Sequence, residues 1–240
     1  MQFDTYSREH PQFYGGTAVV PVLRNALARK GGTFVDLGCG DGARLDALVG
    51  QGLLSSFQRT IGIDLSPTRI ERLQARLPDV TCIVGDACAI PLPDASVDLL
   101  YSDQVIEHVP SDHAMAVEIA RVLKPSGCAV VGSVLRRPGA WYIYKVDGQR
   151  RLDPTHLREY GSADLYASVF RSAGLRVTDV HSIPLTYPLS DLAMRLMIRL
   201  KMLRVDGAPN PYSDRIMKAI RSVHVPIPRY ATIYAVAEKA

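Results

Sequence analysis

Residues 34–45 read FVDLGCGDGARL, and this stretch predicts the fold around which the rest of the chain is organised. A short apolar segment ends in Asp36 and leads directly into the alternating glycines Gly38, Gly40 and Gly42. A turn without side chains lets a ligand lie against its backbone, and the helix expected after it points its N-terminal amides at that ligand. Phosphate loops and tight hairpins also use glycine, so the segments that follow decide the meaning of this turn.

A second apolar segment, RTIGID over residues 59–64, ends in Asp64, 22 residues beyond Gly42. In a strand–helix–strand unit this spacing places the carboxylate at the carboxyl end of the neighbouring strand, where it can accept both hydroxyls of a ribose. The alternative role for Asp64 is to cap the next helix. Ser66 followed by Pro67 is the better helix start, so we expect Asp64 to be free for a ligand.

Three further strands are expected over residues 80–87, 97–104 and 128–135. The helix before the last of them is expected to end at the Lys124-Pro125-Ser126-Gly127 segment, because proline cannot continue a helix and glycine turns the chain back. Strands that alternate with amphipathic helices predict an α/β fold, in which a parallel sheet is covered on both faces.

Together these segments resemble the class I S-adenosylmethionine-dependent methyltransferases, and in particular a broad small-molecule group with the sequence EHV after the fourth strand. The resemblance covers roughly residues 34–135 and rests on VDLGCGDG, IGIDLS, VGDACAIPLPDASVDLLYSDQVIEHV and VLKPSGCAVV, in that order. It implies a Rossmann-like seven-stranded sheet, mostly parallel, with its last strand antiparallel. It also implies S-adenosyl-L-methionine as the cofactor, bound by Asp36, Gly38, Gly40, Asp64, Leu65, Asp86, Ala87 and Ser102.

A nicotinamide-dependent dehydrogenase is the rival interpretation of the glycine turn. That class needs G-x-G-x-x-G to hold a diphosphate, whereas this chain has G-x-G-x-G followed by Ala43 and Arg44. A second acidic residue, Asp86, suits the exocyclic amine of an adenine. One adenosine can therefore satisfy Asp64 and Asp86 together, which favours the methyltransferase.

The cofactor of this family carries an activated methyl group, so the protein must hold a nucleophile in line with it and exclude water. A hydroxyl acceptor also needs a base, and histidine suits this role by its pKa. The candidate catalytic residues are His108, His156 and Asp103, which follows the fourth strand near the expected methionine end of the cofactor. His108 can equally brace the site, and His156 can instead be a loop histidine that binds Glu159 or a backbone carbonyl.

Composition narrows the class of protein further. The chain has 240 residues, 47% of them hydrophobic, which is enough to bury the core of one domain with additions. Its four cysteines show no C-x-x-C pair and predict the reduced thiols of a cytoplasmic protein, and no metal site is expected. The first residues lack the apolar core of a secretory signal, and no run of about 18 apolar residues predicts a spanning helix.

The single domain is expected to consist of a cofactor-binding core with three additions. The regions are an N-terminal cap (1–30), the core (31–135), an acceptor-side loop (136–160) and a helical insert or lid (187–224). The insert lies between the expected sixth strand, which ends in residues 181–186, and the seventh, over residues 230–239. Aromatic side chains in the cap can close the pocket or attach the cap to the core, and those in the loop are expected to line the acceptor pocket. They are Tyr6, Phe13 and Tyr14, and Trp141, Tyr142 and Tyr144.

Residues 187–204 predict an amphipathic helix with leucines on one stripe. A lid, a dimer contact and peripheral contact with the inner membrane surface are all compatible with it, so the chain is expected to be a monomer or a homodimer. Residues 136–240 hold 17 Lys and Arg against 9 Asp and Glu, which suits an anionic lipid or substrate. Nucleic acid is not expected, because no basic run is interleaved with aromatic residues.

Two functions follow from these patterns. The first is transfer of a methyl group from S-adenosylmethionine to a small-molecule acceptor, amphipathic, lipid-like or anionic, by in-line displacement. The second is a non-catalytic module that binds S-adenosylmethionine or S-adenosylhomocysteine and serves regulation or assembly. The intact set of cofactor motifs favours the first.

Overall fold

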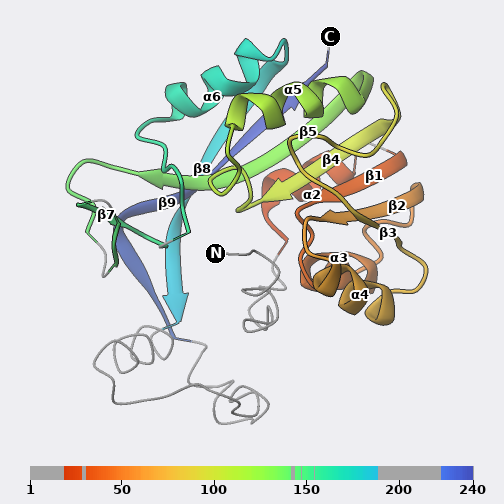
Figure 1. Cartoon of the computed structure of the whole chain (residues 1–240), viewed down its shortest axis with the longest axis horizontal. Helices are drawn as coiled ribbons and strands as arrows, with labels where there is room; N and C mark the ends of the chain where they lie inside the picture. The colour runs from red at the N-terminus through yellow and green to blue at the C-terminus, as the bar shows by residue number, and fades with distance from the viewer. Residues whose placement is uncertain are drawn as a thin grey trace.

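The computed structural model describes residues 19–28, 31–141, 144–146, 148–153, 155–188 and 223–239. Its centre is a seven-stranded sheet in the order β3-β2-β1-β4-β5-β9-β8 (Figure 1). These strands are β1 Gly32–Leu37, β2 Phe57–Asp64, β3 Thr81–Val84, β4 Val97–Asp103, β5 Leu123–Arg136, β8 Arg176–Pro188 and β9 His224–Glu238. β1 to β5 pair in parallel, and β9 runs antiparallel to β5 and β8. The predicted sheet, with an antiparallel last strand, is confirmed.

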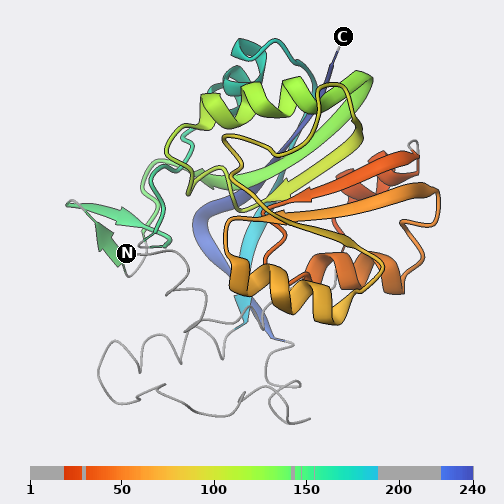
Figure 2. The same ribbon diagram turned by 45° about the vertical axis from the view of Figure 1, so that its right-hand side comes forward.

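Helices cover both faces of this sheet (Figures 1 and 2). They are α2 Pro21–Leu27, α3 Ala43–Gly50, α4 Pro67–Arg76, α5 Asp112–Val122 and α6 Ala163–Ser172. α5 and α6 contribute Met115 and Phe170 to one buried cluster, and α2, α3 and α4 contribute Leu23, Leu48 and Leu73 to another. The central strands are therefore buried on both sides, which is why their sequences read as continuous apolar runs.

The register of the strands brings the predicted motifs to one edge of the sheet. Leu37 of β1 pairs with Ile63 of β2, and Asp36 pairs with Tyr101 of β4. The carboxyl ends of β1, β2 and β4 thus lie side by side. Chain order also changes direction between β1 and β4, and ligands of open α/β sheets bind at such a point.

The limits of two strands differ from those predicted. β3 ends at Val84, three residues early, because Asp86 already forms an isolated bridge with Ala89 in the next turn. β5 begins five residues early, because Leu123 pairs with Val97 before the strand continues along β4. α5 ends immediately before β5, as the lysine–proline signal predicts.

Several predicted additions lie outside the described residues. These are the cap aromatics Tyr6, Phe13 and Tyr14, the loop residue Tyr142, and residues 189–222 of the insert; β8 itself runs to Pro188. The proposed roles of residues 187–204 therefore stay predictions. Between β5 and α6 the chain forms a small hairpin that the sequence analysis missed, with β6 Tyr144–Val146 antiparallel to β7 Gln149–Arg151. Among the described residues, no helix is both long and apolar enough to cross a membrane.

Candidate active site

The glycine turn lies between β1 and α3 and is tied to the neighbouring strand. The backbone amides of Gly38 and Cys39 donate to the carbonyl oxygen of Ile63, at 2.7 and 3.0 Å. Gly38 has a φ of +78°, and a Cβ added there would lie 2.2 Å from a methyl carbon of Val105. Both the conformation and the close approach of Val105 therefore require glycine.

Asp64 is not free, contrary to the expectation from the sequence. One of its carboxylate oxygens accepts the amide of Gly40 and the other accepts the amide of Ser66, both at 2.9 Å. Ser66 caps α4 as predicted, with its hydroxyl accepting from the Arg69 amide. The prediction failed because a carboxylate at the end of β2 reaches two backbone amides at once. A carboxylate oxygen can accept a second hydrogen bond, so Asp64 both holds the turn and keeps capacity for a ligand hydroxyl.

Asp86 follows β3 beside Asp64 and is exposed. Its side chain accepts the backbone amide of Cys88 at 2.8 Å, which orients the carboxylate. Leu65 is 52% exposed at the end of β2, and Ala87 is buried. The structure thus brings Asp64, Leu65, Asp86 and Ala87 together at two adjacent strand ends, as the sequence analysis predicted from separate motifs.

Two carboxylates lie at the carboxyl ends of β1 and β4, the buried Asp36 and the half-buried Asp103. Asp36 is 3% exposed and one of its oxygens, Oδ2, has no hydrogen-bond partner. Burial raises the pKa of Asp36 to about 7, although the nearby Arg44 guanidinium opposes the shift. Oδ1 of Asp103 likewise has no partner, and burial raises the pKa of Asp103 as well. Unpartnered buried carboxylate oxygens are costly, so their presence at this edge points to a cationic or hydrogen-bonding ligand.

The other oxygen of Asp103 is held by residues that the sequence analysis did not single out. Its Oδ2 accepts from the hydroxyls of Tyr101 and Tyr234, at 3.0 and 3.3 Å, and lies 3.4 Å from a guanidinium nitrogen of Arg44. Arg44 directly follows the glycine turn and could have been found there. Tyr234 could not, because only the antiparallel pairing of β9 with β5 brings it to this edge.

Ser102 connects the same two strand ends. Its side chain is fully buried, and its hydroxyl donates to the carbonyl oxygen of Leu37 at 2.8 Å. The hydroxyl is therefore used within the protein, and it fixes the end of β4 against the start of the glycine turn.

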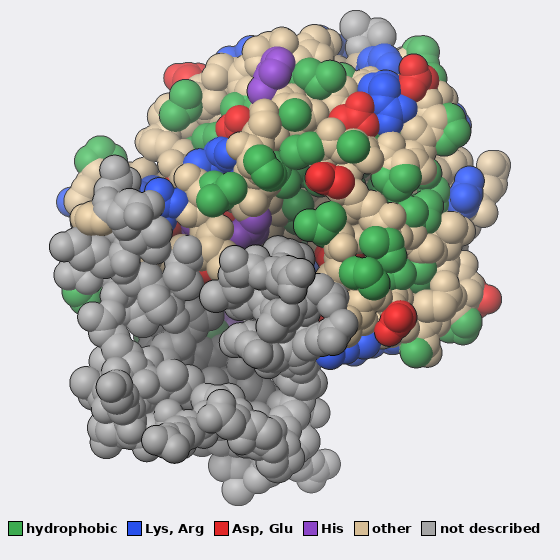
Figure 3. Space-filling view, viewed as in Figure 1, with side chains coloured by type: hydrophobic (Ala, Val, Ile, Leu, Met, Phe, Trp, Pro, Cys, Tyr) green, Lys and Arg blue, Asp and Glu red, His purple; other side chains and the backbone are tan. Residues whose placement is uncertain are grey.

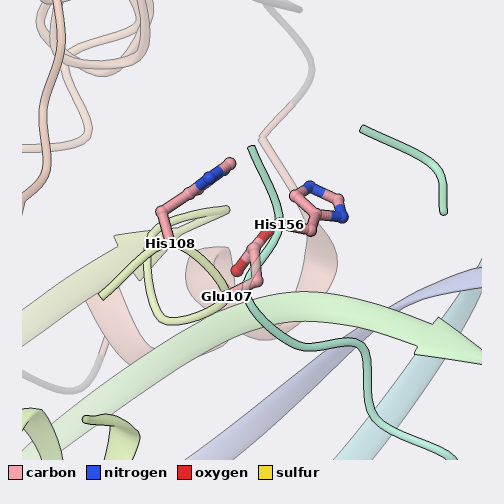
Figure 4. A group of neighbouring side chains, drawn as sticks. All are labelled: Glu107, His108 and His156. Carbon is pink, nitrogen blue, oxygen red and sulfur yellow. The ribbon is translucent and has the colours of Figure 1, made fainter. Parts of the chain in front are cut away.

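A second group of side chains lies beyond the end of β4. Glu107, His108 and His156 have ligating atoms that all lie within 4.8 Å of one another (Figure 4). The two imidazole rings are 4.9 Å apart between centroids, at an interplanar angle of 66°. The structure thus brings the two histidines predicted to be catalytic together, although 48 residues separate them in the sequence.

Each histidine is oriented by an oxygen at its Nδ1 atom. Nδ1 of His156 lies 3.0 Å from Oε1 of Glu159. This contact is the one expected if His156 is a loop histidine that binds Glu159. Nδ1 of His108 lies 3.3 Å from the carbonyl oxygen of Thr155 and 3.1 Å from its hydroxyl. Burial, assisted by His156, lowers the pKa of His108 to about 4, so its imidazole is neutral at pH 7.

Residues 152–160 are held firmly against the segment that follows β4. The Arg158 guanidinium donates to the carbonyl oxygens of Ile106 and Val109, at 2.8 and 2.6 Å. The Leu157 amide donates to the carbonyl oxygen of Glu107 at 2.9 Å. These contacts were not predicted, since nothing in the local sequence shows which distant carbonyls an arginine will meet.

Two arginine-lined cavities adjoin this group and share Glu159. One has a volume of about 280 Å³ and is lined by Arg136, Arg137, Pro138, Gly139, Glu159 and Gly161. The other, of about 190 Å³, is lined by Arg136, Arg151, Leu157, Arg158 and Glu159. On the face shown in Figure 3, hydrophobic side chains of the described residues are scattered among acidic and basic ones.

Comparisons with known proteins agree with this geometry. Residues 35–131 match the protein family described as a methyltransferase domain. A protein of Mycolicibacterium smegmatis named probable S-adenosylmethionine-dependent methyltransferase is 32% identical over 160 residues, covering 66% of this chain and 58% of the relative. The malonyl-[acyl-carrier protein] O-methyltransferase of Hahella chejuensis is 31% identical over 201 residues, covering 79% of this chain and 66% of that protein. The chain thus spans between about half and two thirds of these relatives.

A solved structure with a similar fold is the [4+2]-cyclase SpnF. It matches with a TM-score of 0.63 at 21% identity, covering 91% of this chain and 80% of that one. This likeness concerns the fold alone, whereas the family match and the relatives rest on sequence similarity. These findings support a class I S-adenosylmethionine-dependent methyltransferase, a family whose cofactor is S-adenosylmethionine.

Proposed function

We propose that this protein transfers the methyl group of S-adenosylmethionine to an oxygen-bearing small molecule. The observation that carries the proposal is the pair of carboxylates at the glycine turn, the buried Asp36 and the half-buried Asp103, each with one buried, unpartnered oxygen. The cofactor is cationic at its sulfonium and its ammonium, so it fits a site with this charge. The diphosphate of a nicotinamide dinucleotide would be repelled by the same two carboxylates, which argues against the dehydrogenase alternative.

The residues present fit an adenosyl ligand along the ends of these four strands, β1 to β4. In this proposal Asp64 binds the ribose hydroxyls, Asp86 the adenine amine, and the exposed side chain of Leu65 covers the base, beside Ala87. The turn residues Gly38 and Gly40, with Asp36 and Ser102, surround the methionine end. The support is that the first group lies at the ends of β2 and β3 and the second at the ends of β1 and β4.

When bound, the cofactor supplies the activated methyl group and its leaving group. The chain's own task is to hold the acceptor in line and keep water out, which can contribute on the order of 7–11 kcal/mol. We place the acceptor's reactive oxygen beside His108 and His156, which position it and can take up its proton. Asp103 acts from the opposite side, where it helps to hold the cofactor.

The acceptor is proposed to carry an anionic or strongly polar group. The arginine-lined cavities support this, because Arg136 and Glu159 line both of them and Glu159 contacts His156. The Hahella relative is named as an O-methyltransferase of malonyl-[acyl-carrier protein], which supports an oxygen acceptor. The same fold in a protein named as a cyclase shows that fold alone does not establish methyl transfer.

The test uses the purified full chain with methyl-labelled S-adenosylmethionine and metabolite extracts. We expect label to move into a small molecule, and Asp36→Asn to abolish most of that transfer. Exposed Asp79→Asn, in the turn between α4 and β3, is the matched control and should leave transfer unchanged. Tight binding of S-adenosylhomocysteine without transfer to any acceptor would instead support the non-catalytic module.

A further inference from the structure

We propose that Glu107, His108 and His156 bind one divalent transition-metal ion, with Zn²⁺ as the best match. This reverses the expectation from the sequence, which considered cysteine spacing and acidic clusters but not histidines brought together by the fold. Two imidazoles and one carboxylate are the protein ligands of a common class of zinc site that leaves a position open for a further ligand. Their ligating atoms already lie within 4.8 Å of one another, as Figure 4 shows for the side chains.

The carboxylate of Glu107 is built like a metal ligand. Its side chain is fully buried, and Oε2 is fixed by the hydroxyl of Ser133 at 2.9 Å. Oε1 has no hydrogen-bond partner. A buried carboxylate oxygen with no partner costs free energy, and a cation held by the adjacent imidazoles would remove that cost.

The imidazoles have a defined tautomer that suits metal binding. Nδ1 of His156 faces a carboxylate oxygen of Glu159, and Nδ1 of His108 faces the carbonyl oxygen of Thr155. Both oxygens only accept hydrogen bonds, so each Nδ1 carries the proton and each Nε2 keeps its lone pair. Metal-bound histidines are typically oriented in this way, by a carboxylate or a carbonyl at the second nitrogen.

The ligands come from two segments that are held together without a metal. Glu107 and His108 follow β4, and His156 lies in the loop after β7. Arg158 bonds to the carbonyl oxygens of Ile106 and Val109, which flank the first pair of ligands. A site whose ligands are already positioned loses little conformational freedom on binding. The imidazoles favour Zn²⁺, Co²⁺ or Fe²⁺ over Mg²⁺ and Ca²⁺, which prefer oxygen ligands.

The open coordination position would take an oxygen of the acceptor, and this part of the inference rests on the proposed function. A bound metal would orient such an oxygen and lower its pKa, so that its proton would pass to water before methyl transfer and the histidines would act as ligands rather than as bases. Metal binding itself needs neither the cofactor nor turnover, and it can be measured alone.

The test is titration of the full metal-free chain with Co²⁺, followed by visible absorption, and then competition with Zn²⁺. We expect one Co²⁺ per chain, with the absorption of a site of low coordination number, displaced by one equivalent of Zn²⁺. Glu107→Gln and His156→Gln should abolish this signal. Glu159→Gln, which alters the partner of His156 Nδ1 but also the contacts of Leu152 and Tyr230, should weaken binding by about 10–100-fold in a variant whose melting temperature is unchanged. Exposed His113→Gln, whose imidazole contacts Ser172, is the control and should bind normally.

Thermal melting of every variant separates loss of a ligand from loss of the fold. His108→Gln, at a half-buried position, provides a second variant if Glu107→Gln does not fold. The metal proposal is overturned if the native chain binds no Co²⁺, or if folded Glu107→Gln or His108→Gln binds it as tightly as the native chain. Calorimetric binding of S-adenosylmethionine to the same samples tests the cofactor site separately, so either proposal can fail without the other.

Discussion

The two sides of the proposed site differ in the charge that they can hold. On the cofactor side, the buried Asp36 and the half-buried Asp103 each have one unpartnered oxygen, next to the glycines of the turn. On the acceptor side, two imidazoles and Glu107 lie beside cavities lined by arginines. This difference indicates which ligand each side binds. A cationic sulfonium fits the first side, and an oxygen-bearing acceptor, with or without a metal, fits the second.

The largest expected effect separates the two sides directly. His156→Ala should reduce turnover by roughly 10²–10⁴-fold, the range for losing a group that acts on a proton or positions the reacting atom, and leave the cofactor Kd unchanged. Single-turnover kinetics and calorimetry on the same preparation measure both quantities. Lost cofactor binding together with a collapsed melting temperature would show that His156 is structural. His113→Ala is the control.

A second substitution tests whether Gly38 is required by the close approach of Val105 as well as by its left-handed backbone conformation. Gly38→Ala should lower the free energy of unfolding by about 2–4 kcal/mol, from left-handed strain plus the clash with Val105. Gly174→Ala is the matched control, because Gly174 has a φ of +84° but no atom within 4 Å of the added Cβ. Its cost should be about 1–2 kcal/mol, from strain alone. Equal losses in urea unfolding would remove Val105 from the explanation.

Asp64 tests whether a carboxylate already bonded to two amides still serves a ligand. Asp64→Ala should weaken cofactor binding by roughly 1.5–3 kcal/mol, the scale for losing hydrogen bonds to a charged group. Calorimetric titration gives this value directly, and Asp79→Ala provides the exposed control. An unchanged dissociation constant would leave Asp64 with only its bonds to Gly40 and Ser66.

The smallest effect is a pH dependence confined to the cofactor side. Because the pKa of Asp36 is raised to about 7, protons and the cationic cofactor compete for its carboxylate. Affinity should therefore be constant above pH 8 and fall below pH 7, by up to about tenfold per pH unit. Asp36→Asn should bind weakly at all pH values and lose this slope. A slope that persists in the variant would assign the titration to another group.

In the ligand-free protein, the contribution of Asp36 to stability should change with pH in the direction opposite to that of the cofactor affinity. The folded pKa of Asp36 lies above its unfolded value near 3.8, so the folded state binds the proton more tightly. The contribution of Asp36 to stability is therefore present below pH 4 and is lost as the pH rises toward 7. Chemical unfolding of Asp36→Asn at pH 8 should accordingly show a gain over the native chain.

Much of the cofactor side could be predicted from the sequence, because its residues lie in short continuous motifs at strand ends. The spacing from the glycine turn to Asp64 is set by one strand–helix–strand unit, so local periodicity was enough to place them together. The hydrogen-bond partners of these residues could not be predicted in the same way. That Asp64 bonds to Gly40 and Ser66 depends on side-chain directions that residue spacing does not contain.

What the sequence alone determined is the order of strands and helices, the α/β class and the edge at which the motifs meet. Tertiary structure decided the contacts between distant segments: His108 beside His156, Tyr234 beside Asp103, and the arginines around Glu159. The physical reason is the distance along the chain over which each kind of interaction acts. Apolar periodicity and turn residues act over a few positions of the chain, whereas these contacts join segments about 50 to 130 residues apart.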